Sequence, residues 1–191
     1  MRKVIVSVYT TLDGIMSPLD WHFQFWNEEL GKYAHDVLFA SDALLMGRET
    51  FEIFAASWPS RTAADDGPGA EGYVDRINSL PKFVASTTLK EPIEWNASLI
   101  KGDVAEAVSK LKQQPGQDIL MYGAGPVAHT LIQHGLIDEL RVWVHPVVWG
   151  SGKHLFNNAS DIPALKLVDT RAFSSGVVVL SCQPVKAEQH A

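Results

Sequence analysis

The alternation of apolar and polar positions along the chain predicts strands and helices that follow one another in turn. Short apolar or β-branched runs bounded by turn residues are typical of strands. Such runs predict strands at Lys3–Thr10, Ala43–Met46, Lys82–Ser86, Ala97–Lys101, Ile119–Tyr122, Glu139–Val148, Lys166–Thr170 and Val177–Gln183. Because Ser174-Ser175-Gly176 separates the last two runs, we expect them to form a closing antiparallel hairpin.

Helical periodicity separates most of these runs. Apolar residues spaced at i, i+3, i+4, i+7 and i+8, together with capping and stop residues, are typical of amphipathic helices. These signals predict helices at Asn27–Ala40, Glu49–Ala56, Asp103 to Pro115 and Pro126 to Gly135. The segment Ser57–Gly72 is rich in glycine and proline and predicts a loop, the best candidate for a mobile segment.

The order of these elements indicates an α/β protein. Strands that alternate with helices build a mostly parallel central sheet with helices on both faces, here with an antiparallel hairpin at the C-terminal end. The length of 191 residues fits one domain, which we expect to span residues 1–185. Residues 186–191 are polar and are expected to form a short tail.

Composition narrows the possible partners. The net charge is −6 and no run is rich in lysine or arginine, so we expect neither nucleic acid nor an acidic membrane as a partner. No window approaches the apolar length of a membrane span. The single cysteine, Cys182, allows no intrachain disulfide, and the histidine spacings indicate no metal site. These features predict a cytoplasmic protein.

Two glycine-marked turns follow predicted strands and precede predicted helices. In the first, Gly47 allows close backbone approach, Arg48 offers a cation for phosphate, and Thr50 offers a hydroxyl. In the second, Gly123-Ala124-Gly125-Pro126 exposes backbone donors. Each turn has a purely structural alternative: a plain strand-to-helix turn with a surface arginine, or a tight turn that only packs its helix.

In their order along the chain, these motifs and several others resemble the dihydrofolate reductase superfamily, and more closely the reductase domain of riboflavin biosynthesis and its stand-alone relatives. The segments that carry the resemblance are Thr11–Gly14, Leu45–Phe51, Ser86–Thr88, Tyr122–Gly125, Asp138–Leu140 and Pro146–Lys153. The resemblance implies a three-layer dihydrofolate-reductase-like fold, NADPH as cofactor, and hydride transfer to a small pyrimidine- or pteridine-like substrate.

The same resemblance implies the residues of the cofactor site. It implies that phosphates contact Gly47, Arg48 and Thr50, that Ser86 and Thr87 lie near the adenosine 2′-phosphate, and that Gly123, Ala124, Gly125 and Val127 approach the pyrophosphate and ribose. The loop of Asp13, Gly14 and Ile15 would flank the nicotinamide. Since no second lysine or arginine follows Ser86, we expect a weaker preference for NADPH over NADH.

The substrate side is less well marked in the sequence. Glu29 and Asp13 are the candidate catalytic residues, although Glu29 has a structural alternative as a first-turn acid favoured by the helix dipole. Trp26 and Tyr122 are the candidate substrate-binding residues. Trp26 belongs to an aromatic cluster with Trp21, Phe23 and Phe25, which suits stacking on a heterocycle but equally suits packing or a dimer surface.

Three functions therefore remain open at this stage. The first is an NADPH-dependent reductase related to the 5-amino-6-(5-phosphoribosylamino)uracil reductase of riboflavin synthesis. The second is true dihydrofolate reduction, and the third is a nucleotide-binding domain without catalysis. A homodimer is also expected, with the apolar segment Val142–Trp149 as a possible interface.

Overall fold

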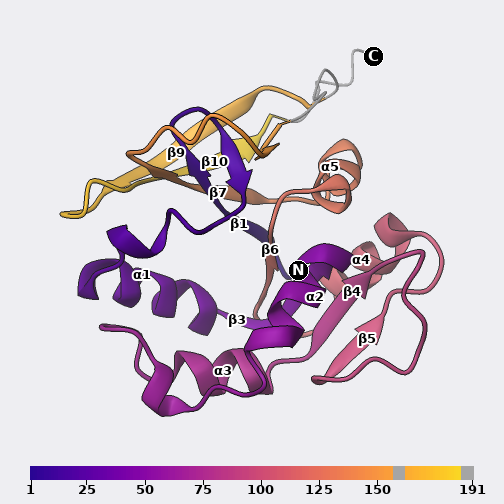
Figure 1. Cartoon of the computed structure of the whole chain (residues 1–191). Helices are drawn as coiled ribbons and strands as arrows, with labels where there is room; N and C mark the ends of the chain where they lie inside the picture. The colour runs from indigo at the N-terminus through magenta and orange to yellow at the C-terminus, as the bar shows by residue number, and fades with distance from the viewer. Residues whose placement is uncertain (157–161, 186–191) are drawn as a thin grey trace.

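One twisted eight-stranded sheet organises the computed structural model, which describes residues 1–156 and 162–185 (Figure 1). The strand order is β5-β4-β3-β6-β1-β7-β10-β9. The strands are β1 Val4–Thr11, β3 Ser41–Gly47, β4 Lys82–Ala85, β5 Ala97–Leu99, β6 Asp118–Tyr122, β7 Glu139–His145, β9 Leu165–Ala172 and β10 Val178–Pro184. The six strands from β5 to β7 are parallel, and β10 is antiparallel to both β7 and β9. The predicted α/β class and closing hairpin are confirmed.

The helices cover both faces of this sheet. They are α1 Glu28–Phe39, α2 Arg48–Ser57, α3 Tyr73–Ser79, α4 Val104–Gln113 and α5 Pro126–Gln133. Figure 1 shows α4 and α5 on one side of the sheet and α1 and α3 on the other. Apolar residues of α4 and α5 belong to one core cluster, and apolar residues of α1 and α3 belong to another. Two 3₁₀ turns, η1 Phe23–Phe25 and η2 Ala63–Asp65, and a small two-stranded sheet of β2 Ile15–Ser17 with β8 Lys153–His154 complete the described elements.

Local capping explains where the two amphipathic helices begin. The side chain of Asn27 accepts a hydrogen bond from the backbone N–H of Leu30 (2.9 Å), and Asp103 accepts one from Glu106 (2.8 Å). Each cap satisfies a backbone N–H that has no partner within its helix. The predicted starts of these helices are therefore confirmed to within a residue.

Helix α3 was not predicted, because the sequence pattern indicated only a loop as far as Gly72 and nothing helical before β4. It is only seven residues long, begins after Gly72, and buries just Val74 and Ile77. A helix of two turns with two apolar contacts gives almost no periodic signal. The segment before it also differs from expectation, since Ala63–Asp65 forms a 3₁₀ turn rather than plain loop.

Two sequence expectations meet the described structure only in part. The strand predicted at Glu139–Val148 ends at His145. Within the segment expected at a dimer interface, Val142 and Trp143 are buried and Val148 and Trp149 are exposed, and the homodimer stays a prediction. The predicted tail, residues 186–191, lies outside the described residues. Across the part of the chain that is described, no helix combines the length and apolar character needed to cross a bilayer.

Candidate functional site

The two glycine-marked turns lie side by side at one edge of the sheet. Strands β3 and β6 are hydrogen-bonded neighbours and run parallel, with Met46 opposite Tyr122 in register. Gly47 ends β3 and Gly123 follows β6, so both turns leave the sheet at its carboxyl edge. In open α/β sheets this edge is where ligands bind. The sequence motifs, 76 positions apart, thus meet in space.

The two turns are packed so tightly that glycine is required in one of them. A Cβ on Gly123 would lie 2.8 Å from Oγ1 of Thr50, and the φ angle of Gly123 is +80°, a conformation that L side chains rarely adopt. A Cβ on Gly47 would lie 3.5 Å from the Val127 side chain. Thr50 of the first motif therefore lies against the Gly123 turn, and Val127 of the second lies against Gly47. A Cβ on Gly125, in contrast, would meet no atom within 4 Å.

Helices α2 and α5 begin at these turns without side-chain caps. Their N-cap residues are Gly47 and Gly125, which have no side chain to accept from the first backbone N–H groups. Uncapped helix amino termini attract anions through these N–H groups and through the helix dipole. The turn at α5 also carries Pro126 at its first position, as the sequence predicts.

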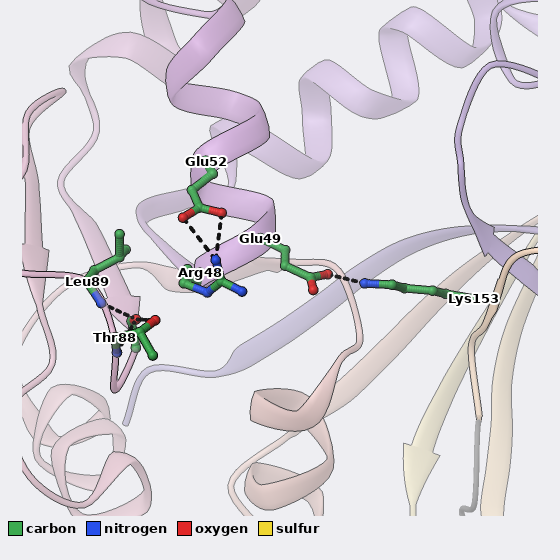
Figure 2. A network of polar contacts seen from close by, with 7 residues as sticks. Arg48, Glu49, Glu52, Thr88, Leu89 and Lys153 are labelled. Atoms are coloured by element: carbon green, nitrogen blue, oxygen red, sulfur yellow. Dashed lines mark hydrogen bonds and ion pairs between the residues drawn. The ribbon is translucent and has the colours of Figure 1, made fainter.

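Charged side chains at the start of α2 are held by exposed partners. Figure 2 shows the Arg48 guanidinium turned back along α2 to Glu52, with Nη1 3.2 Å from the carboxylate, while Glu49 points away to Lys153, 2.5 Å from its Nζ. Both pairs are about half exposed. Exposed pairs of this kind contribute little to stability, so Arg48 can change partners at small cost.

A cavity of about 490 Å³ opens at the same edge, beside β4 and β5. Its lining includes Ser86 and Thr87, two of the predicted cofactor-site residues, and also Lys101, which the sequence did not single out. The Nζ of Lys101 lies 2.9 Å from Glu91, and this hydrogen bond raises the pKa of Lys101. The Ser86 hydroxyl oxygen accepts from the backbone N–H groups of Thr88 and Leu89, the turn drawn in Figure 2.

A cation at this cavity comes from a strand other than β4. No lysine or arginine directly follows Ser86, whereas Lys101 follows β5, the neighbour of β4. The only sequence signal was its place at the end of a predicted strand.

The loop after β1 is fastened by Asp13. Its carboxylate accepts hydrogen bonds from the Thr11 hydroxyl (2.5 Å) and from the backbone N–H groups of Gly150 (2.8 Å) and Trp149 (3.2 Å). These bonds, that from Thr11 above all, lower the pKa of Asp13 to about 2. Asp13 therefore stays a carboxylate at neutral pH, which favours a positioning role over proton donation.

The neighbours of Asp13 are held by backbone contacts. Gly14 has a φ of +82° and its carbonyl accepts from Leu155, while the N–H of the buried Ile15 donates to the Thr11 hydroxyl.

Glu29 is not brought to the glycine turns. Its carboxylate accepts from the backbone N–H (2.9 Å) and hydroxyl (2.8 Å) of Ser174, and these bonds lower the pKa of Glu29. Ser174 lies between β9 and β10, at the far side of the sheet from β6. The observed contacts fit a residue that ties α1 to the hairpin.

The two candidate substrate-binding residues share one neighbouring segment, residues 66–73. The Tyr122 hydroxyl lies 2.6 Å from that of Tyr73, and a Cβ on Gly67 would lie 2.8 Å from the indole nitrogen of Trp26. Of the aromatic cluster, Trp21 is buried against His145 and Phe23 is exposed. Phe25 packs with Trp26 near Trp143. Within this cluster Trp21 is buried, Phe25 and Trp26 are half-buried, and Phe23 faces solvent.

The described carboxyl edge fits a dinucleotide. Three features line this edge in the order of the strands. The uncapped start of α5, with open space at Gly125, follows β6, and the uncapped start of α2 follows β3. The cavity with its hydroxyls and its lysine lies beside β4 and β5. Neighbouring strands lie about 4.8 Å apart, so this row extends over more than 10 Å. A bound group with several phosphates would meet donors along its whole length.

Comparisons with known proteins match nearly the whole chain. The sequence profile of the family described as "RibD C-terminal domain" matches residues 2–179. YyaP, an uncharacterized protein of Bacillus subtilis (strain 168), is 36% identical over 182 residues, covering 93% of this chain and 92% of YyaP.

Solved structures share the fold. A protein from Shewanella sp. PV-4, provisionally assigned to riboflavin biosynthesis, has a TM-score of 0.73 at 23% identity, covering 96% of this chain and 99% of that one. The deaminase/5-amino-6-(5-phosphoribosylamino)uracil reductase of Thermotoga maritima has a TM-score of 0.64 at 17% identity, covering 96% of this chain and 57% of that one.

Proposed function

We propose that this chain, which belongs to the RibD C-terminal domain family, is a reductase that uses NADPH to transfer a hydride to a small pyrimidine- or pteridine-like heterocycle. The observation that carries the proposal is the adjacency of the β3 and β6 turns, with Thr50 against Gly123 and Val127 against Gly47. A single dinucleotide can extend across both turns only because these strands are neighbours.

The residues that would hold NADPH follow the order of the strands. When bound, the nicotinamide supplies the hydride. The chain's own residues would bind and orient the cofactor: Asp13, Gly14 and Ile15 beside the nicotinamide, Gly123, Ala124, Gly125 and Val127 along the ribose and pyrophosphate, Gly47, Arg48 and Thr50 on the phosphates, and Ser86, Thr87 and Lys101 at the 2′-phosphate.

On the substrate side, the observed contacts favour Tyr122 over Glu29 as the group that meets the heterocycle. Tyr122 ends the strand that leads into the Gly123 turn, whereas Glu29 is bonded to Ser174. Dihydrofolate reduction, which in the family's relatives uses a carboxylate on the first helix, is for this reason not the function that the site supports best.

The proposal is tested by titrating the protein with NADPH and with NADH while the quenching of tryptophan fluorescence is measured. Arg48→Ala should weaken NADPH binding about tenfold to a hundredfold, because a charge-assisted hydrogen bond contributes about 1.5–3 kcal/mol. The urea midpoint should stay within error, since the Arg48–Glu52 pair is half exposed. Lys110→Ala, which removes a cation from a similar exposed pair on α4, is the matched control and should leave binding unchanged.

Two results would contradict the proposal in different ways. Equal NADPH affinity in the parent and in Arg48→Ala would show that Arg48 does not bind the cofactor. Tight NADPH binding without turnover of any oxidised pyrimidine or pteridine in a broad panel would favour a nucleotide-binding domain without catalysis.

A further inference from the structure

Two tyrosine hydroxyls meet at the carboxyl edge, one from the sheet and one from α3. Tyr122 is the last residue of β6 and Tyr73 is the first residue of α3, and their hydroxyl oxygens lie 2.6 Å apart. Tyr9 of β1 stands on the same face, two residues beyond Ser7, which pairs with Tyr122. Tyr9, Tyr73 and Tyr122 are each half-buried residues.

The hydrogen bond between the two phenols leaves one proton unused. Each hydroxyl carries one proton and can also accept, and either oxygen can be the donor in the bond that joins them. The two hydroxyls together hold two protons, and their mutual bond uses one. The second proton is free to be donated to a third group, provided that this group is an acceptor.

The pair is a donor that carries no charge. Burial raises the pKa of Tyr73 to about 12 and also raises the pKa of Tyr122 well above its usual value, so both remain protonated at neutral pH. A carboxylate or phosphate placed among the aromatic side chains around this pair would lose hydration at a cost, whereas a neutral acceptor would find a matching donor.

The attachment of α3 does not depend on this bond. Asp66 accepts hydrogen bonds from the backbone N–H groups of Gly72 (2.6 Å) and Val74 (2.8 Å), which fixes the start of the helix. A Cβ on Gly31 would lie only 1.9 Å from the Pro68 carbonyl oxygen, so the preceding segment packs backbone against α1. The Tyr73→Phe substitution would keep the ring contacts of α3 and remove only the hydroxyl. The hydroxyl of Tyr73 is therefore not needed to attach the helix.

Aromatic rings flank the two phenols. The Phe54 ring lies 5.3 Å from that of Tyr122, and the Trp58 ring lies 5.7 Å from that of Tyr73. Tilted ring pairs at these distances pack favourably, so the two phenols lie among aromatic rings of the protein. The surroundings therefore combine apolar faces with a single neutral donor.

We propose that Tyr122, oriented by Tyr73, donates a hydrogen bond to a carbonyl or imine acceptor of a flat, uncharged heterocycle. The inference rests on the proposed function, and it narrows the substrate class to molecules that present a neutral acceptor at this end. Tyr122 is the group that touches the substrate, and Tyr73 is a positioning residue.

This contact would serve the reaction as well as binding. When the carbon of a C=O or C=N bond accepts a hydride, the π electrons move onto the oxygen or nitrogen, which becomes negative. A fixed donor aimed at that atom stabilises the charge as it develops. The donor stays protonated across the neutral range, so it needs no titration to act.

Binding of lumazine, a flat dioxopteridine, tests the inference, with lumazine-6-carboxylate as the charged counterpart. Tyr122→Phe should raise the dissociation constant of lumazine about tenfold, and Tyr73→Phe should raise it less, because one hydrogen bond to a neutral acceptor is lost or misaligned. Tyr33→Phe makes the same chemical change on α1 and is the matched control, with no effect expected. The parent should bind lumazine-6-carboxylate at least tenfold more weakly than lumazine.

A spectroscopic readout separates donation from packing. In infrared difference spectra of ¹³C-carbonyl lumazine, binding to the parent should move the C=O stretch to lower wavenumber, and Tyr122→Phe should abolish the shift while Tyr33→Phe keeps it. Circular dichroism verifies that each variant is folded. An unchanged dissociation constant or an unchanged carbonyl band in folded Tyr122→Phe overturns the inference, as does failure of the parent to bind lumazine.

The same titrations distinguish the two proposals. NADPH binding that survives in every tyrosine variant, with no dependence of lumazine on Tyr122, removes the inference and leaves the proposed function. Lumazine binding that depends on Tyr122 in a protein that does not bind NADPH supports the inference and removes the proposed function.

Discussion

The two edges of the parallel sheet use charge in opposite ways. At the amino edge, Arg2 is buried, pairs with Asp42, and donates to the carbonyl of Gln117 (2.7 Å). Lys112 is likewise buried beside Asp138, whose carboxylate also accepts from the backbone N–H of Val4 (2.7 Å).

At the carboxyl edge, the pairs Arg48–Glu52, Glu49–Lys153 and Lys101–Glu91 are all substantially exposed. Each pair at the amino edge joins a buried cation to a carboxylate that is about one-third exposed, and losing the carboxylate would leave the buried cation unpaired, whereas exposed pairs exchange partners with little loss. The charged pairs that contribute most to folding therefore lie at the amino ends of the strands, and the charged pairs that are open to a ligand lie at the carboxyl ends.

The largest effect should come from breaking the amino edge. Asp138→Asn leaves Lys112 buried beside a neutral amide, and the free energy of unfolding should fall by about 2–4 kcal/mol. Urea denaturation measures this loss. Glu106→Gln removes the charge of an exposed pair on α4 and should cost less than about 0.5 kcal/mol. If both substitutions cost the same, the buried pair has no special role.

An intermediate effect should come from Gly123→Ala, which tests whether the close contact between Gly123 and Thr50 is needed for NADPH binding. The positive φ alone costs about 1–2 kcal/mol of stability, and the new methyl group must also displace Thr50, so NADPH binding should weaken at least about tenfold. Gly135→Ala has a similar φ of +65° and no atom within 4 Å, which makes it the matched control for backbone strain. A loss of NADPH affinity in both variants would trace the effect to strain rather than to the contact with Thr50.

The smallest effect concerns selectivity at the β4–β5 cavity. Lys101→Ala should lower the preference for NADPH over NADH about tenfold, because one charge-assisted contact with a 2′-phosphate is lost. NADH affinity and the urea midpoint should not change, since the lysine side chain is 79% exposed. Glu91→Gln frees Lys101 and should leave NADPH binding equal or tighter; weaker binding there would argue that the ion pair itself shapes the cavity.

Much of the fold could be predicted because its signals are local. The strand runs, the caps Asn27 and Asp103, and the hairpin around Gly176 each depend on residues within one or two turns of chain. The two glycine motifs could also be found, but their adjacency could not be derived from spacing, since β3 and β6 are separated by two other strands in sequence.

The parts that could not be predicted depend on contacts between distant segments. Tyr73 lies 49 positions from Tyr122, and Lys101 reaches its cavity from a different strand than Ser86. Glu29 shows the converse, because its sequence position suits a catalytic acid while its partner, Ser174, lies 145 positions away. Neither capping rules nor periodicity carries information about such pairs.

Strand β9 gives the domain a long free border among the described residues, with all eight positions at least partly exposed. The unpaired backbone N–H and C=O groups of an edge strand can pair with an extended segment of another chain, and such pairing can start aggregation. Lys166, Asp169 and Arg171 interrupt the apolar Leu167 and Val168 along this border. Charged side chains along an edge strand disfavour the addition of a further strand, so these residues oppose edge-to-edge association of the chain.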